Sequence, residues 1–515
     1  MPTQVNLHKQ NYVGTNTKIN DRPVAIKASQ VHSYSSRRRI ITDVMSPAPD
    51  QTSLQSGSNR MIQYIIKNNV ANTIKNLTLR FQVRSDLGSS ALAPTAMWFQ
   101  RIEIINRTTG EEIARLHGDI MFMYQNVVRS ENAASWSELI NIDPVDYKHV
   151  ETGHLVNTTR YYYLPLVGSV FDNMHLDMTH TTNEIEIRLI PVSDGITIDG
   201  GSSTLALLEV ASLFDVELND YASETVKRSL LQKSIIAHQY LDSQDYRLTA
   251  QTFAASTAYE FDLDQFKHTS AGLMLAIRKT GYNNTNGGSL SYSSLGDGTI
   301  DVIGSGGTSI FGGGRAIHAK YLKNIIAPQY VGSEYFLHSN MYPILFGDLN
   351  KALTKGSMDG VHHFDGEKHK LRIETPAVGT NAFVTISQTA MTAGSVRLTY
   401  KDKVTDNIPF SATASSIAIA AQSLFKHKAV NVVGTFQTAS IVITVSELNG
   451  QPFNLTDRIM VQYQPNAVPT SNLASSVLTP WTEGWDATGT YEVIIYSLYF
   501  KAIYQNFNAL STRDL

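Results

Sequence analysis

A change of hydrophobic period within residues 97–128 constrains the fold of this chain more than any other sequence feature. In its first part, MWFQRIEIIN, alternate side chains such as Ile102 and Ile104 are apolar, which is the pattern of a half-buried strand. Gly110 marks a turn, because glycine adopts positive φ without steric cost, and a short second strand is expected after it. Residues 116–128 then carry apolar side chains at helical spacing. A helix is therefore expected inside a β-rich region.

Length and composition limit the possible classes of protein. The 515 residues, with a mass of 56.9 kDa, can form roughly two to four domains of about 150 residues. Because the chain has no cysteine, disulfides and thiolate sites are excluded. The net charge of −3 argues against nucleic-acid binding by bulk charge. No basic, apolar leader and no apolar run of about 18 residues is present, so we expect a soluble protein without an export signal.

The region 58–191 is dense in strand patterns and holds the one helix predicted above. Antiparallel strands interrupted by a single helix favour a β-sandwich or jelly roll over an α/β fold, because the regular alternation of strands and helices is missing. The strands expected besides those of the first stretch are Met61–Lys67, Leu77–Arg84, Tyr161–Leu166 and Glu184–Pro191.

A second β-rich block follows a glycine-containing linker, Val192–Ser203, and opens with residues 205–218. The low-complexity run 281–314 is predicted to be a long surface loop. Ser333–Asn340 is predicted as a strand and Met341–Lys355 as a helix. Strands, a helix and further strands therefore occur twice, as a repeat of structure more than of sequence.

An interruption of the second block is predicted at residues 383–463. Alternating strands surround a short helix at Ser415–Lys426, and the series resembles a small domain of phage tail and surface proteins. The second block is expected to resume at Thr490–Tyr504, which is apolar on both faces and so should be buried on both. An insertion from a loop is tolerated because the entropy of loop closure grows slowly with length.

The first 39 residues are polar and basic, with Asp21 as the single acid. They are predicted to form an arm that touches phosphates of nucleic acid or of lipid headgroups, or else an ordinary polar leader. The basic residues that would make the contact are Lys9, Lys18, Arg22, Lys27, Arg37, Arg38 and Arg39.

Several of these segments resemble a known family. Residues 98–105, the turn at Gly110, LHGD at 116–119 and YLPL at 163–166 resemble the first jelly roll of double-jelly-roll major capsid proteins. These build tailless icosahedral DNA viruses, among them membrane-containing phages, adenovirus-like hexons and the nucleocytoplasmic large DNA viruses. The resemblance implies an all-β fold of two consecutive jelly-roll barrels, each with a short inserted helix, plus a small α+β inserted domain.

The resemblance also implies an organisation and a set of partners. The chain would form homotrimers that pack as pseudo-hexagonal capsomers in a virion capsid, after synthesis in the host cytoplasm. Its partners would be neighbouring capsomers, vertex (penton) and minor capsid proteins, and an internal membrane or the genome through the arm. The domains expected are an arm (1–39), a first jelly roll (40–195), a second jelly roll (204–382 and 464–515) and an inserted surface domain (383–463).

Candidate chemical sites are few. The common nucleophile, nucleotide-binding and zinc-protease motifs are missing, so we predict no enzyme, no cofactor and no small-molecule substrate. A cluster of His362, His363, Asp365 and His369 could bind a metal or sense pH, or could be a polar loop with exposed imidazoles. Asp297 and Asp301, in the glycine-rich run, hint at calcium but fit a solvated turn better.

Exposed aromatic residues leave a second class of function open. Tyr161–Tyr163, Trp481 and Trp485 could line a carbohydrate groove, or could pack in a core or a subunit interface. The leading hypothesis is a major capsid protein. The alternative is a phage tail or receptor-binding (adhesin) protein, suggested by the inserted domain, and a glycan-active enzyme is a third reading that lacks a recognisable acid pair.

Overall fold

The structure of the chain is a computed structural model. The ranges that it describes are 13–19, 22–26, 35–45, 61–67, 73–85, 89–128, 140, 154–156, 159–168, 170–171, 176–178, 184–197, 205–219, 236–284, 289–311, 315–331, 335–355, 358–364, 368–387, 390–425, 428–447, 452–469, 474–481, 485–506 and 509–514.

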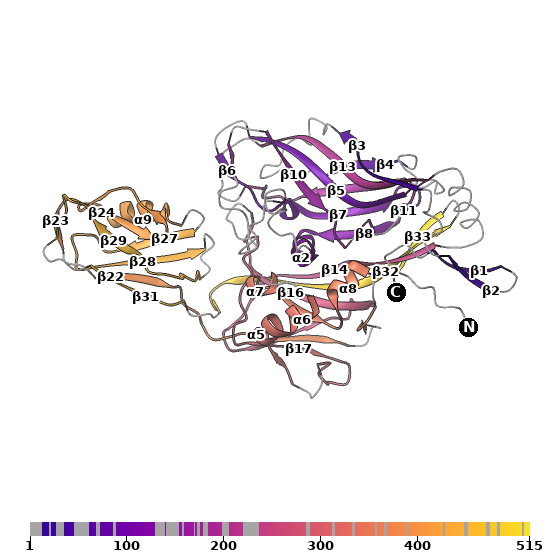
Figure 1. Ribbon diagram of the computed structural model, residues 1–515. Helices are drawn as coiled ribbons and strands as arrows, with labels where there is room; N and C mark the ends of the chain where they lie inside the picture. Colours follow the sequence, from indigo (N-terminus) through magenta and orange to yellow (C-terminus); the bar gives the residue numbers. More distant parts are fainter. Residues whose placement is uncertain are drawn as a thin grey trace.

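The first barrel consists of two facing antiparallel sheets (Figure 1). Its long-strand sheet has the order β10-β5-β13-β3, and its short-strand sheet the order β4-β12-β7-β8. When the eight strands of this barrel are numbered 1 to 8 in chain order, the two sheets have the orders 6-3-8-1 and 2-7-4-5, which is a jelly-roll arrangement. The bounds are β3 (Ser35–Met45), β4 (Ile62–Ile66), β5 (Thr73–Ser85), β7 (Phe99–Asn106), β8 (Glu112–His117), β10 (Thr159–Pro165), β12 (Ile185–Pro191) and β13 (Leu205–Asn219).

The second barrel repeats the same connections. Its long-strand sheet is β14-β32-β16-β19 and its short-strand sheet is β15-β21-β17-β18. Numbered in chain order, these strands give 1-8-3-6 and 2-7-4-5, which are the orders of the first barrel with the long-strand sheet read from its other edge. The predicted repeat of structure is therefore confirmed, and the fold is all-β with two consecutive jelly rolls. The bounds are β14 (Ile236–Thr252), β15 (Ala258–Asp262), β16 (Thr269–Lys279), β17 (Thr299–Ile303), β18 (Ile317–His318), β19 (Tyr342–Leu345), β21 (Lys370–Glu374) and β32 (Thr490–Asn506).

Shorter strands border these sheets. A hairpin near the N-terminus pairs β1 with β2, β6 pairs with β9, and β11, β20 and β33 extend the long-strand sheets. Their bounds are β1 (Val13–Ile19), β2 (Arg22–Ile26), β6 (Ser89–Ala91), β9 (His154–Val156), β11 (Leu176–Asp177), β20 (His362–His363) and β33 (Ala509–Asp514).

The helices occupy corresponding connections in the two barrels. In the first barrel α2 (Gly118–Val128) directly follows β8. The short 3-10 helix η2 (Thr95–Trp98) lies earlier, just before β7. In the second, four short helices follow the corresponding strand β18, and α8 (Leu349–Lys355) lies one connection later. The four are α5 (Ala319–Tyr321), the π-helix η3 (Leu322–Ile326), α6 (Ala327–Val331) and α7 (Tyr335–His338).

This arrangement corrects two predictions. Ser333–Asn340 was predicted as a strand and contains α7. Of the predicted helix Met341–Lys355, Tyr342–Leu345 form strand β19, and the end, Leu349–Lys355, is the helix α8. All four β19 residues are buried, and they pair with Gly272–Leu275 of β16, so tertiary pairing overrides the helical spacing of the leucines. The helices equivalent to α2 are those at residues 319–331, and not the predicted one.

Strand pairing also moves the predicted domain boundaries. The run 205–218 was placed in the second barrel, but β13 pairs with β5 and β3 of the first. The arm was ended at residue 39, yet β3 begins at Ser35, so Arg37–Arg39 lie by backbone pairing on the first barrel. The glycine-rich run 281–314 is not only a loop, because it contains β17, whose Ile300 and Val302 are buried.

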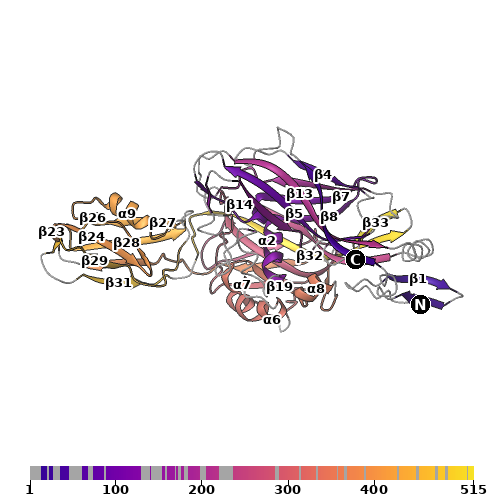
Figure 2. The ribbon, with the colours of Figure 1, turned by 45° about the horizontal axis from the view of Figure 1, so that its top comes forward.

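The inserted domain stands apart from both barrels (Figures 1 and 2) and has its own apolar core. One sheet runs β27-β28-β22-β31, and the helix α9 packs on β27, with the Thr413 side chain capping its N-terminus. The domain ends near Trp481 and not at 463, because β31 pairs with β22. Its elements are β22 (Phe383–Ser387), β23 (Met391–Ala393), β24 (Ser395–Tyr400), β25 (Lys403–Val404), β26 (Ile408–Pro409), α9 (Ala414–Gln422), β27 (Lys428–Val433), β28 (Ser440–Glu447), β29 (Met460–Tyr463), β30 (Val468–Pro469) and β31 (Ser475–Thr479).

Strand β32 confirms the prediction of burial on both faces. Val493 and Ile495 face the interior of the second barrel, while Ile494, Tyr496 and Leu498 belong to a core that continues into the first barrel. The two barrels therefore share one apolar core across their contact, which holds them as a single body. In the described part of the chain, none of the helices is both long and apolar enough to cross a membrane.

Candidate functional site

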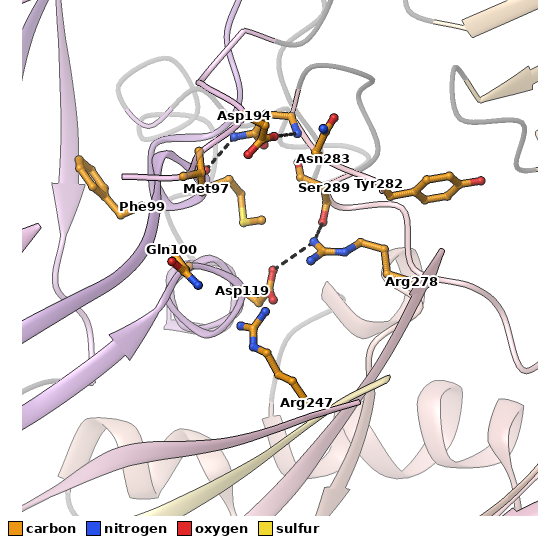
Figure 3. A pocket seen from close by; sticks show the side chains of 13 residues that line it. Met97, Phe99, Gln100, Asp119, Asp194, Arg247, Arg278, Tyr282, Asn283 and Ser289 are labelled. Carbon is orange, nitrogen blue, oxygen red and sulfur yellow. Dashed lines mark hydrogen bonds and ion pairs between the residues drawn. The ribbon is translucent and has the colours of Figure 1, made fainter. Parts of the chain in front are cut away.

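Several of the buried charged side chains in the described part of the chain lie at the contact between the two barrels. We call it the inter-barrel joint: α2 and β8 of the first barrel lie against the outer face of the long-strand sheet β14-β32-β16 of the second (Figure 1). Figure 3 shows part of this joint, with Asp119 at the start of α2 facing Arg247 and Arg278, which come from β14 and β16.

Asp119 anchors the first barrel to the second. Its Oδ1 accepts a hydrogen bond of 2.8 Å from the Tyr292 hydroxyl, and its Oδ2 accepts one of 2.7 Å from the Tyr496 hydroxyl. Burial alone would raise the pKa of Asp119, but the guanidinium groups of Arg278 and Arg247 and the two hydroxyls outweigh it and hold that pKa below its usual range. The carboxylate therefore stays charged within the joint.

The two arginines are fixed by further partners. Arg278 donates from Nη2 to Glu492 Oε2 at 2.9 Å and from Nη1 to the Ser289 carbonyl at 2.8 Å. Arg247 donates from Nε to Asp245 Oδ2 at 2.7 Å and from Nη2 to the Tyr496 hydroxyl at 3.0 Å. Tyr496 thus accepts from a cation and donates to Asp119, which couples the two barrels through one hydroxyl.

A second buried carboxylate, Asp242 on β14, faces β8. Its Oδ1 accepts the Arg115 backbone N–H at 3.1 Å, and its Oδ2 accepts the Tyr499 hydroxyl at 3.2 Å. Burial raises the pKa of Asp242 above its usual value, although Lys501, 3.5 Å away, opposes that rise. Lys501 also donates to the Glu112 carbonyl at 3.0 Å, so β8 is hydrogen-bonded to β14 and β32 through side chains.

The loop after β16 ties the opposite end of the joint. Asn284 is buried, and its side-chain amide donates to the carbonyls of Met97 at 2.9 Å and Gly195 at 3.0 Å in the first barrel. Its backbone N–H donates to Asp194 at 2.6 Å. A small pocket of about 110 Å³ remains between this loop, Gly118 and the two arginines (Figure 3).

Comparisons with known proteins agree with this architecture. No family model and no curated protein matches the sequence. Among solved structures, the capsid of the virus PBCV-1, as a quasi-atomic model, is similar with a TM-score of 0.55 and 11% identity, over 93% of this chain and 97% of that one. A crystal structure of PBCV-1 VP54, fitted into a reconstruction of the virophage Sputnik, gives a TM-score of 0.54 and 10% identity over the same shares. The chain is a double jelly roll.

Gly118 is required where this double jelly roll joins β8 to α2. A Cβ at this position would lie 2.6 Å from the Phe99 carbonyl oxygen and 2.9 Å from that of Ala96, so the backbone would have to move. Gly118→Ala is expected to lower the free energy of unfolding by about 1–3 kcal/mol, the usual cost of overpacking. Chemical denaturation measures it. Gly306→Ala, whose nearest neighbour would lie 3.9 Å away, is the control, and an equal effect of both variants would contradict the account.

His117 makes the joint sensitive to acid. The pKa of His117 is lowered from 6.5 to about 4, mainly because the imidazole is buried. Arg247 and Arg115 also lower this pKa, whereas Asp245, at 3.4 Å, and Asp119 raise it and only partly offset the burial. Because the unfolded chain binds this proton more readily, the contribution of the neutral imidazole is complete above pH 6.5 and is lost as the pH falls towards 4. Asp119 and Asp245, whose pKa values are lowered, lose theirs only at still lower pH.

The resulting prediction concerns the pH dependence of stability. Between pH 7 and 4.5 the wild type should lose roughly 2–3 kcal/mol more unfolding free energy than His117→Gln, since a shift of one pKa unit is worth about 1.4 kcal/mol. Denaturation curves at several pH values measure the two slopes. Parallel slopes for the two proteins would show that His117 does not titrate as described.

The basic arm residues are only partly placed. Lys9 and Lys27 lie outside the described residues, whereas Lys18 and Arg22 lie on the hairpin strands β1 and β2. Arg37, Arg38 and Arg39 lie on β3, opposite Glu217, Val216 and Asp215 by register. The chain brings Lys18 and Arg22 to one hairpin but does not gather all seven residues on one element.

The histidine cluster and the two aspartates of the glycine-rich run were the other predicted site residues. His362 Nε2 lies 3.2 Å from His369 Nε2, and His363 pairs with Thr269, while Asp365 lies outside the described residues. Where the chain is described, no three His, Asp or Glu side chains converge as a metal site would need. Asp297, which is exposed, pairs with Lys320, and the mostly buried Asp301 accepts a hydrogen bond from Ser309.

The aromatic residues also divide between core and surface. Trp485 is buried and stacks on Tyr491 at a centroid distance of 4.5 Å, and its indole N–H donates to the Phe253 carbonyl, so it is a core residue. Trp481 packs on the core of the inserted domain. Tyr162 is buried, whereas Tyr161 is 46% exposed on the outer face of the first barrel.

Proposed function

We propose that this chain is a major capsid protein that assembles as a homotrimer and tiles an icosahedral shell. The observation that carries the proposal is the inter-barrel joint, which fixes two barrels of the same topology side by side in one rigid body. Three copies of two similar barrels present six similar sides, so a threefold capsomer can occupy near-sixfold lattice positions. The likeness of the fold to the PBCV-1 capsid supports this role.

Copy number tests this function. In purified particles of the virus that encodes it, the chain should be the most abundant protein, and its trimers should account for most of the shell mass. Quantitative gel densitometry or mass spectrometry of such particles measures it. A few copies per particle would overturn the proposal and favour the alternative of a tail or receptor-binding protein, to which the separate inserted domain points. The same proposal implies that the chain contacts vertex (penton) proteins and minor capsid proteins.

We also propose that the basic arm touches an anionic surface under the shell, either lipid headgroups or packaged nucleic acid. The support is the sequence that precedes β3, which carries Lys9, Lys18, Arg22 and Lys27 against the single acid Asp21. Contacts to phosphates weaken steeply as salt rises, whereas apolar contacts between barrels do not. Binding of the purified chain to anionic vesicles or to DNA should therefore fall with salt, and should be lost when Lys9, Lys18, Arg22 and Lys27 are replaced by glutamine. Binding unchanged by that replacement would show that the arm has no such role.

A further inference from the structure

Two imidazoles face each other at the connection between β20 and β21 of the second barrel. His362 Nε2 lies 3.2 Å from His369 Nε2, and the two ring planes are inclined at 83° to each other. We call these two residues the histidine pair. Their ring nitrogens are close enough to share one bound group.

The histidine pair connects the two sheets of the second barrel. His362 lies on β20 and pairs with Ser270 of β16, in the long-strand sheet. His369 directly precedes β21 of the short-strand sheet, and its carbonyl accepts a hydrogen bond of 2.9 Å from the Leu263 backbone N–H, just after β15. Each histidine is therefore held by the backbone of a different sheet, so the barrel itself sets the distance between the two rings.

Aromatic side chains fix the orientation of both rings. The buried Phe364 ring lies edge-on to both imidazoles, with centroid distances of 4.7 Å to His362 and 5.0 Å to His369. Phe346 lies 5.1 Å from the His362 ring. His369 is buried, whereas His362 is half-buried, so solvent reaches the pair from the His362 side. Rings that are already packed lose little side-chain entropy when they bind a further group.

The spacing of the two nitrogens fits a single metal ion. Two nitrogens bound to one tetrahedral zinc ion at about 2.0–2.1 Å lie about 3.3–3.4 Å from each other. The observed 3.2 Å needs almost no movement of either ring. Neutral imidazole is a preferred ligand of Zn²⁺, Ni²⁺ and Cu²⁺, whereas Ca²⁺ and Mg²⁺ prefer oxygen ligands. Without an ion, the same contact is a hydrogen bond from one imidazole to the other.

The neighbouring histidines have other partners. His363 Nδ1 lies 3.1 Å from the Thr269 hydroxyl, and His268 stacks on Tyr499 and lies 3.7 Å from Asp514. Within the described ranges, no third His, Asp or Glu side chain converges on the pair. Two protein ligands are fewer than the three or four of most zinc sites, so water must complete the coordination and the ion should exchange readily.

We propose that the histidine pair binds one transition-metal ion of the Zn²⁺, Ni²⁺ or Cu²⁺ class, with water at the remaining positions. The ion cross-links the two sheets of the second barrel and stabilises the folded chain, because a ligand that binds only the folded state shifts the folding equilibrium towards it. The site lies within one subunit and does not depend on the proposed function, so the purified chain is sufficient for the test.

Zinc titration of the purified chain tests the site. Calorimetry with ZnCl₂ should give one ion per chain at the pair, and the melting midpoint should rise by a few degrees in excess ZnCl₂ but not in MgCl₂ or CaCl₂. His362→Gln and His369→Gln should each weaken zinc binding by roughly tenfold or more, since even outer-shell partners of a metal are worth about 10–100-fold. His363→Gln removes the adjacent imidazole, which contacts Thr269, and is the matched control that should bind zinc as the wild type does.

A crystal structure of the wild type grown with ZnCl₂ gives a second readout that needs no variant. Anomalous scattering at the zinc edge should place the ion about 2.0–2.1 Å from both Nε2 atoms. Circular dichroism establishes that each variant folds. A wild type that binds no zinc, equal zinc binding by all three variants, or anomalous density only away from the pair would each overturn the proposal.

Discussion

Asp119→Ala is expected to lower the free energy of unfolding of the two-barrel body by about 3–5 kcal/mol, the effect of removing one partner from a buried ion pair. The carboxylate is buried, and its loss leaves Arg278 and Arg247 facing each other without the anion between them. The hydroxyls of Tyr292 and Tyr496 lose their acceptor at the same time.

Chemical denaturation, followed by the fluorescence of the buried tryptophans, measures this loss. The matched control is Asp297→Ala, which breaks a pair with Lys320 at a carboxylate that is 86% exposed and should leave the transition where it was. If Asp119→Ala unfolded at the same denaturant concentration as the wild type, the buried charges would not hold the barrels together.

Removing the inserted domain is expected to leave the barrels folded and able to assemble. Its apolar core includes only residues between Ala382 and Trp481, so no barrel core is opened. The chain leaves and re-enters the second barrel at one place, because Trp485 N–H donates to the Ala377 carbonyl at 2.7 Å and Gly379 N–H to the Trp485 carbonyl at 3.3 Å. A short glycine-serine linker can therefore replace residues 382–481 with little change in closure entropy.

Calorimetry and light scattering of the deletion variant check this expectation. One melting transition should disappear, the barrel transition should keep its midpoint, and the oligomeric state should match the wild type. The isolated segment 382–481 should melt cooperatively by itself. Insoluble protein, or loss of assembly on deletion, would show that the inserted domain is part of the barrel structure.

Local pattern was enough to predict much of the fold. The shift of period near Gly110 marked two strands and α2, and the apolar run at 490–504 marked a strand buried on both faces. The errors occur where pairing with a distant strand determines the secondary structure or the domain of a segment. The spacing of Leu345, Leu349 and Leu353 is helical, yet Tyr342–Leu345 form a strand because their backbone pairs with β16. β13 and β31 were assigned to the wrong domain, because no local sequence feature of either strand identifies the strand with which it pairs.

The inter-barrel joint could not be predicted from the sequence. Asp119 and Tyr496 are separated by 377 positions, and Asp119 and Tyr292 by 173, so only the fold brings them together. A charge such as Arg278 at the end of the apolar run AGLMLAIR was a usable signal, because a charged residue in a buried strand needs a partner. Asp119, in the LHGD run that carried the family resemblance, was the other signal.

Electron microscopy of the purified protein tests the central proposal most directly. Class averages of negatively stained particles should show a ring of six barrel-sized lobes with threefold symmetry and three protruding inserted domains, at a mass three times the chain's 56.9 kDa. Particles with only two lobes and one protrusion, or assemblies with twofold symmetry, would contradict a capsomer built from three double jelly rolls.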